Sequence, residues 1–130
     1  MSAWSCTPGS TLLVPSGPNG LHLFVIVLGP MVLPGYGSKP QTVMVSVTTR
    51  RDGVPHDAAC ELEAADHPFL QHGSYIAYRY ARVDSTEHVE GMVKSGAWQP
   101  HAPCSQEVLQ RIVDGMRATR LAPREIKGLF

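Results

Sequence analysis

The chain has 130 residues, of which 43% are hydrophobic and only 17% charged, and its 11 Lys and Arg residues balance 11 Asp and Glu residues. This length fits one domain, over residues 1–130, and the lack of net charge argues against nucleic-acid binding by bulk electrostatics. Any contact with nucleic acid must therefore be local. The 12 glycines and 11 prolines favour a turn-rich β fold over a helical bundle.

Runs of apolar, β-branched and aromatic residues, separated by Gly and Pro, predict five strands: residues 11–15, 21–29, 42–48, 58–64 and 74–83. The run at 21–29 is apolar on both faces, which is typical of a central strand. Residues 16–20 (SGPNG) predict a turn, and residues 30–40 predict a loop because Pro or Gly interrupts every possible element. A weaker run at 89–93 predicts one more short strand.

A helix of about residues 105–120 is predicted near the C-terminus. Ser105 can cap it, and Glu107 places a negative charge in the first turn, where the helix dipole favours it. Its apolar residues fall at helical spacing: Val108, Leu109, Ile112 and Met116. A second helical turn is expected after Pro123. These elements together predict a mainly β protein with a C-terminal helix, folded as a small, curled antiparallel barrel.

The cysteines Cys6, Cys60 and Cys104 are odd in number and share no close spacing, which predicts reduced thiols rather than a disulfide framework or a zinc knuckle. The first ten residues contain no basic segment followed by an apolar run. The longest apolar run, residues 23–33, is interrupted by Gly29-Pro30 and is too short to cross a bilayer. We therefore expect a cytoplasmic protein without a signal peptide or a membrane span.

Four stretches, taken in this order, carry a resemblance to a known family: GSTLLVPSGPNGLHLFVIV (9–27), VMVSVTT (43–49), YIAYRYARV (75–83) and PCSQEVLQRIVDGM (103–116). The chain resembles the MazF/PemK family of toxin endoribonucleases. The resemblance implies an SH3-like barrel with a C-terminal helix that forms a homodimer. It also implies metal-independent cleavage of single-stranded RNA, without a cofactor, and an antitoxin protein as the partner of a toxin–antitoxin pair.

The catalytic pair of that family is an arginine that opens the second strand and a threonine that ends the third. Thr48 and Thr49 stand where the resemblance places the threonine. His22 stands where the family has its arginine, which is a departure from the family pattern. Arg50 or Arg51, at the end of the neighbouring strand, could supply the missing cation.

Metal-free RNA cleavage needs a base for the ribose 2′-hydroxyl, an acid for the leaving 5′-oxygen, and donors that stabilise the charge on the phosphate. Histidine can act as the acid or the base near neutral pH, and arginine presents a planar, permanently charged fork to phosphate. If the second and third strands pair antiparallel, His22 lies beside Thr49 and Arg50. The predicted catalytic residues are therefore His22, Thr49 and Arg50.

Other basic, aromatic and hydroxyl side chains predict an RNA-binding surface: Thr48, Arg51, His72, Tyr78, Arg79 and Arg82. A tyrosine at strand spacing, such as Tyr78, is equally typical of a barrel core with a hydrogen-bonded hydroxyl.

Several of these candidate residues could instead have a purely structural role. His22 between two leucines fits a half-buried structural histidine, and residues 50–53 (RRDG) fit an exposed hairpin. Asp66, His67 and His72 include zinc-ligand residue types, but their spacing matches no established ligand pattern, so no metal site is predicted. The alternative function is a non-catalytic SH3-like module that binds protein or nucleic acid with the same groove.

Overall fold

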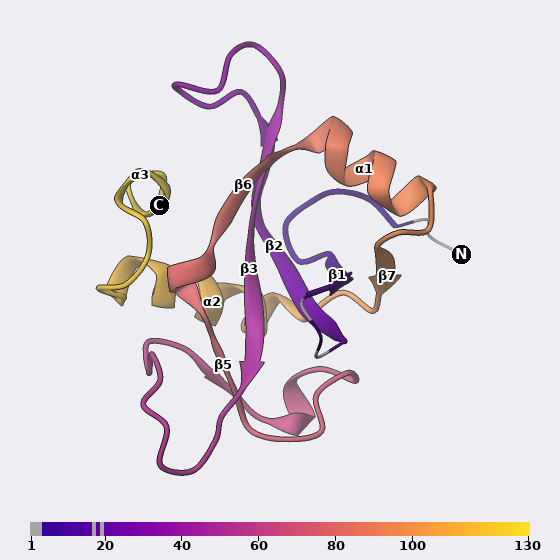
Figure 1. The fold of residues 1–130 in the computed structure, drawn as a ribbon. Helices are drawn as coiled ribbons and strands as arrows, with labels where there is room; N and C mark the ends of the chain where they lie inside the picture. The colour runs from indigo at the N-terminus through magenta and orange to yellow at the C-terminus, as the bar shows by residue number, and fades with distance from the viewer. Residues whose placement is uncertain (1–3, 17, 19) are drawn as a thin grey trace.

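The computed structural model describes residues 4–16, 18 and 20–130, and it shows a twisted sheet with helices on either side (Figure 1). The strands are β1 (Thr11–Pro15), β2 (Leu21–Met31), β3 (Gln41–Thr49), β4 (Glu61–Leu62), β5 (Ser74–Ile76), β6 (Arg82–Ser85) and β7 (Gln99–His101). The helices are α1 (Thr86–Lys94), α2 (Gln106–Ala118) and α3 (Arg124–Lys127), with 3-10 turns η2 (Ala64–Asp66) and η3 (Tyr78–Tyr80). The predicted mainly β class with a C-terminal helix is confirmed.

All strand pairs are antiparallel, and the seven-stranded sheet follows the order β4-β5-β3-β2-β1-β7, with β6 paired to β3 off this path. Strands β4 and β7 end the order, and no pairing between them joins the two ends in the part of the chain that the structure describes. The SH3-like barrel therefore stays a prediction, whereas the sheet itself is established.

Strands β5 and β6 follow one another along the same edge of β3. Strand β5 pairs with residues 47–49 of β3, and β6 pairs with residues 41–44. Between them the chain turns through η3, where the Ala81 N–H donates to the Tyr78 carbonyl (3.0 Å). The single strand predicted for residues 74–83 is therefore wrong, because this turn directs Tyr78 into the core instead of continuing the strand alternation.

Two apolar clusters cover the two faces of the sheet. On β2, Leu23 and Val25 belong to the cluster that α2 covers, whereas Phe24 and Ile26 belong to the cluster that α1 and Trp98 cover. Successive side chains of a strand point to opposite faces, so the nearly continuous apolar run of β2 buries both of its faces. Each helix thus covers the sheet from its own side, as Figure 1 shows.

Helix α2 matches the prediction at its start and on its buried face. The Ser105 hydroxyl accepts a hydrogen bond from the Val108 N–H (3.1 Å), and Val108, Ile112 and Met116 are buried against the sheet. Gly115 is buried on the same face, where a Cβ atom would collide with the Tyr78 hydroxyl. The predicted helical turn after Pro123 is α3.

Three predicted elements differ from the structure or lie partly outside its description. The strand predicted at 58–64 is reduced to β4, because Glu63 N–H donates to the Asp66 carboxylate (2.8 Å) and begins η2. The strand predicted at 89–93 is wrong: it lies in α1, which Ser85 caps through the His88 N–H (3.1 Å). The turn predicted at 16–20 includes Gly17 and Asn19, which lie outside the described residues.

The helices that the structure describes are too short and too polar to span a bilayer.

Candidate functional site

One half of the α1 face of the sheet is left open. Val14 of β1 lies opposite His22, and Leu23 lies opposite Val47, so His22 lies opposite Thr48. Thr48 in turn lies opposite Tyr75 of β5. Directly opposed side chains point to the same face, so His22, Thr48 and Tyr75 form one row across three strands. Helix α1 covers the other end of this face (Figure 1) and leaves the row uncovered.

This row lies in a groove with a volume of about 790 Å³. One wall comes from the β3–β4 connection, including Arg51 and His56, and the other from residues 68–72 with His101 of β7. We call it the histidine groove, because four of the six histidines line it: His22, His56, His72 and His101. None of its described lining residues is acidic. Five side chains that can carry positive charge therefore face one cleft without a carboxylate among them.

The structure brings together five of the residues predicted from the sequence: His22, Thr48, Thr49, Arg51 and His72. Register explains His22 and Thr48, since β2 and β3 pair antiparallel as expected. Thr49 also lines the groove, but as the next residue of β3 its side chain alternates to the opposite face of the sheet. Arg51 is exposed and forms no ion pair with any described residue. Its guanidinium is therefore available to an anion in the groove.

Arg50 lies outside the lining of the groove. Its guanidinium is bound by two carboxylates, at 2.8 Å from Glu63 and at 3.3 Å from Glu61. It also packs against Gly73, where a Cβ atom would collide with the guanidinium. Two acidic partners offset its charge, so the structure assigns Arg50 a role in holding the loops together. The arginine that lines the groove is Arg51, whereas the catalytic role of Arg50 stays a prediction.

A histidine–carboxylate pair that sequence reasoning missed stands at the wall of the groove. His56 Nε2 lies 2.5 Å from Glu61 Oε2, and the imidazole stacks on Tyr75 with ring centroids 5.0 Å apart. The hydrogen bond with His56, assisted by Arg50, lowers the pKa of Glu61, so this carboxylate stays ionised. An ionised carboxylate accepts a hydrogen bond from the Nε2–H of His56, so Glu61 fixes the orientation of this imidazole at the wall of the groove.

The loop that carries His72 is anchored by His67. The His67 imidazole is only 4% exposed; its Nε2–H donates to the Ala102 carbonyl (2.6 Å), and its Nδ1 accepts from the Phe69 N–H (3.1 Å). Both contacts require the neutral ring with the proton on Nε2. Burial lowers the pKa of His67, and the nearby His101 contributes in the same direction. His67 is therefore a structural residue, and only His72 of this loop reaches the groove.

This anchor makes the stability of the protein depend on pH. The unfolded chain takes up a proton on His67 near pH 6.5, whereas the folded chain does so only at lower pH. The contribution of His67 is therefore complete above about pH 6.5 and is lost as the pH falls, by at most about 1.4 kcal/mol per pH unit. Urea unfolding of His67→Gln should show a smaller loss between pH 7.5 and 5 than the wild type. Equal losses in the two proteins would contradict this role.

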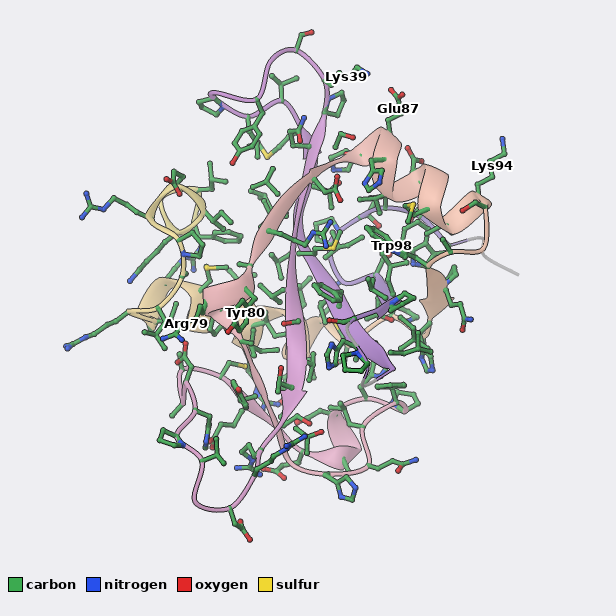
Figure 2. All side chains as sticks on the ribbon, in the orientation of Figure 1. Lys39, Arg79, Tyr80, Glu87, Lys94 and Trp98 are labelled. Carbon is green, nitrogen blue, oxygen red and sulfur yellow. The ribbon has the colours of Figure 1, made fainter. Side chains whose placement is uncertain are left out.

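Three residues predicted to bind RNA lie elsewhere. Tyr78 is fully buried, and its hydroxyl donates to the Ile112 carbonyl (2.6 Å), so it cannot contact RNA. Burial raises its pKa, and the hydroxyl keeps its proton. Arg82 is paired with Asp84 (2.8 Å) and stacks on Trp98, at the far end of β3 from the groove. Arg79 is exposed on η3, on the opposite side of β3 from Trp98 (Figure 2).

The described His, Cys, Asp and Glu side chains do not form a metal site. Among residues 4–16, 18 and 20–130, no three His, Cys, Asp or Glu side chains come close enough to hold a metal ion. The zinc alternative built on Asp66 and His67 is not available, because His67 uses both ring nitrogens and Asp66 pairs with Arg111 (3.2 Å).

With acid–base groups, hydroxyls and one unpaired cation around an open cleft, the site is equipped for proton transfer beside a bound anion. Comparisons of the chain with protein-family models and with curated proteins found no match.

Proposed function

We propose that the protein cleaves single-stranded RNA without a metal ion, in the histidine groove. One observation carries this proposal: four histidines and an unpaired arginine line one groove in which no described residue is acidic. Such a surface attracts a phosphodiester, and two imidazoles can share the two proton transfers that cleavage requires.

The roles follow from the placement of the side chains. His22, in the open row, and His56, oriented by Glu61, are the acid–base pair. Arg51 binds the phosphate, and the hydroxyl of Thr48, in the open row, completes the set of donors. The ribose 2′-oxygen attacks the phosphorus as one imidazole takes its proton. The P–O bond to the 5′-oxygen then breaks as the other imidazole protonates it, which leaves a 2′,3′-cyclic phosphate.

The resemblance to the MazF/PemK family extends this proposal beyond the site. It supports a toxin of a toxin–antitoxin pair that acts in the cytoplasm as a homodimer and is bound by an antitoxin protein. A coding sequence for a small acidic protein beside that of this chain would support the pairing.

The test is incubation of the purified protein with a long single-stranded RNA in EDTA. We expect discrete fragments that end in 2′,3′-cyclic phosphate, because the reaction uses only the ribose hydroxyl and protein side chains. The matched control is a single-stranded DNA of the corresponding sequence. It lacks the attacking 2′-hydroxyl and should stay intact. If folded protein leaves the ribose substrate intact, catalysis is ruled out and a binding module remains.

A further inference from the structure

A second hollow adjoins the histidine groove at His56. It has a volume of about 280 Å³ and shares Pro55, His56 and Tyr75 with the groove. Its other lining residues include Ala77 and Tyr80 near η3 and Leu121 of the α2–α3 connection. We call it the tyrosine hollow. Because three residues line both sites, a ligand in the groove and a ligand in the hollow would be close neighbours.

The tyrosine hollow displays an aromatic ring that the fold does not use. Tyr80 is 66% exposed, whereas its neighbour Tyr78, two residues earlier on the same turn, is fully buried and bonded to α2. Figure 2 shows Tyr80 beside Arg79 on the bend between β5 and β6. Arg79 is exposed and forms no ion pair with any described residue. A planar π surface and an unpaired guanidinium thus stand together at the open edge.

The one carboxylate among the described residues of the tyrosine hollow is already bound within the protein. Asp57 accepts hydrogen bonds from the Thr119 hydroxyl (2.6 Å) and from the Ala59 N–H (2.9 Å). These bonds hold the carboxylate toward the α2–α3 connection. The side chains in the hollow that remain available to a ligand therefore include Tyr80, Arg79, Tyr75 and Leu121.

We propose that the tyrosine hollow binds an unpaired base of the same RNA strand, next to the nucleotide that is cleaved in the histidine groove. This inference rests on the proposed function and names the form of its substrate. The base stacks on Tyr80, and Arg79 binds the phosphate that joins it to the groove, a combination typical of single-strand recognition. A base within a duplex cannot offer its face, so the hollow selects single-stranded RNA and requires at least one nucleotide beyond the scissile bond.

The binding test uses a fluorescent 2′-O-methyl RNA hexanucleotide, which cannot be cleaved because its 2′-oxygen carries no proton. Stacking of one base contributes about 1–3 kcal/mol, so we expect Tyr80→Ala to weaken binding by about 5- to 150-fold. Tyr80→Phe keeps the ring and should bind within about 2-fold of the wild type. Tyr36→Ala removes another exposed tyrosine, from the β2–β3 loop outside both sites, and should bind as the wild type does.

The outcomes separate this inference from the proposed function when the same proteins are also assayed for cleavage of unmodified RNA. Cleavage by the wild type with undiminished hexanucleotide binding by Tyr80→Ala would overturn the tyrosine hollow and leave the function standing. Binding that depends on Tyr80, in a protein that cleaves nothing, would support the hollow and overturn the catalytic function. A wild-type protein that neither binds nor cleaves RNA would overturn both.

Discussion

Replacing His22 with alanine is expected to slow RNA cleavage by ~100-fold or more, the usual scale for the loss of a general acid or base. His22 lies in the open row beside Thr48, so its removal takes an imidazole out of the histidine groove without opening the core. The rate constant kcat, measured with a fluorogenic RNA under saturating conditions, reports the change. The matched control is His88→Ala: this histidine lies on α1, is bonded to Asp84 (2.9 Å), and should be dispensable for cleavage.

The pH profile distinguishes a proton-transfer role from a structural one. Two histidines that act as acid and base give a bell-shaped dependence of kcat on pH, and each single replacement, of His22 or of His56, should remove one limb of the bell. A structural role would lower kcat at every pH and keep the shape. Wild-type kcat in folded His22→Ala protein would contradict the assignment.

Replacing Gly115 with alanine is expected to lower the free energy of unfolding by about 3 kcal/mol. The new Cβ would collide with the Tyr78 hydroxyl and lie 2.9 Å from Cys60 Cβ. Overpacking costs about 1–3 kcal/mol, and displacing the buried Tyr78 hydroxyl from the Ile112 carbonyl costs about 1–3 kcal/mol more. The higher helix propensity of alanine offsets about 1 kcal/mol of this loss.

Urea unfolding at neutral pH measures this change, and Gly91→Ala provides the matched control. Gly91 also lies inside a helix, α1, but apart from its chain neighbours and the backbone of α1 itself no atom lies within 4 Å of a Cβ built there. Alanine at this exposed position should stabilise the protein by about 0.5–1 kcal/mol. Equal effects at the two glycines would show that α2 is free to move away from Tyr78, against the close packing described here.

The part of the site that was predictable from sequence is the part fixed by strand pairing. Once β2 and β3 are adjacent and antiparallel, the burial of their apolar side chains favours one register, and in this register His22 and Thr48 meet. The direction of the Arg50 side chain, by contrast, cannot be predicted from strand pairing. Its direction depends on Glu61 and Glu63, which return to it only after a long connection. No local pattern reports such a contact.

The other errors have equally physical causes. Residues 74–83 alternate as a strand does, but the same spacing also fits two short strands joined by the turn that buries Tyr78. In α1, Val89, Met92 and Val93 follow the three- and four-residue spacing of a helix behind the Ser85 cap, a signal that was present in the sequence. His56 had no such signal, because only the folded loop places it between Glu61 and Tyr75.

On the half-covered face of the sheet, the side chains of the open row are held rigidly by the strands, whereas the walls of the groove are exposed connections that can vary in sequence. The residues of the open row alternate along their strands with core residues, so Thr48 cannot move without Val47, which is packed beneath the sheet. The walls, by contrast, are connections whose side chains are mostly exposed. Substitutions at exposed wall positions other than Arg51 and His56 would therefore be expected to change what the groove binds while the open row keeps its geometry. If the proposed function is right, relatives with other RNA preferences would be expected to differ mainly between residues 52–55 and 68–71, outside Arg51, His56 and His72.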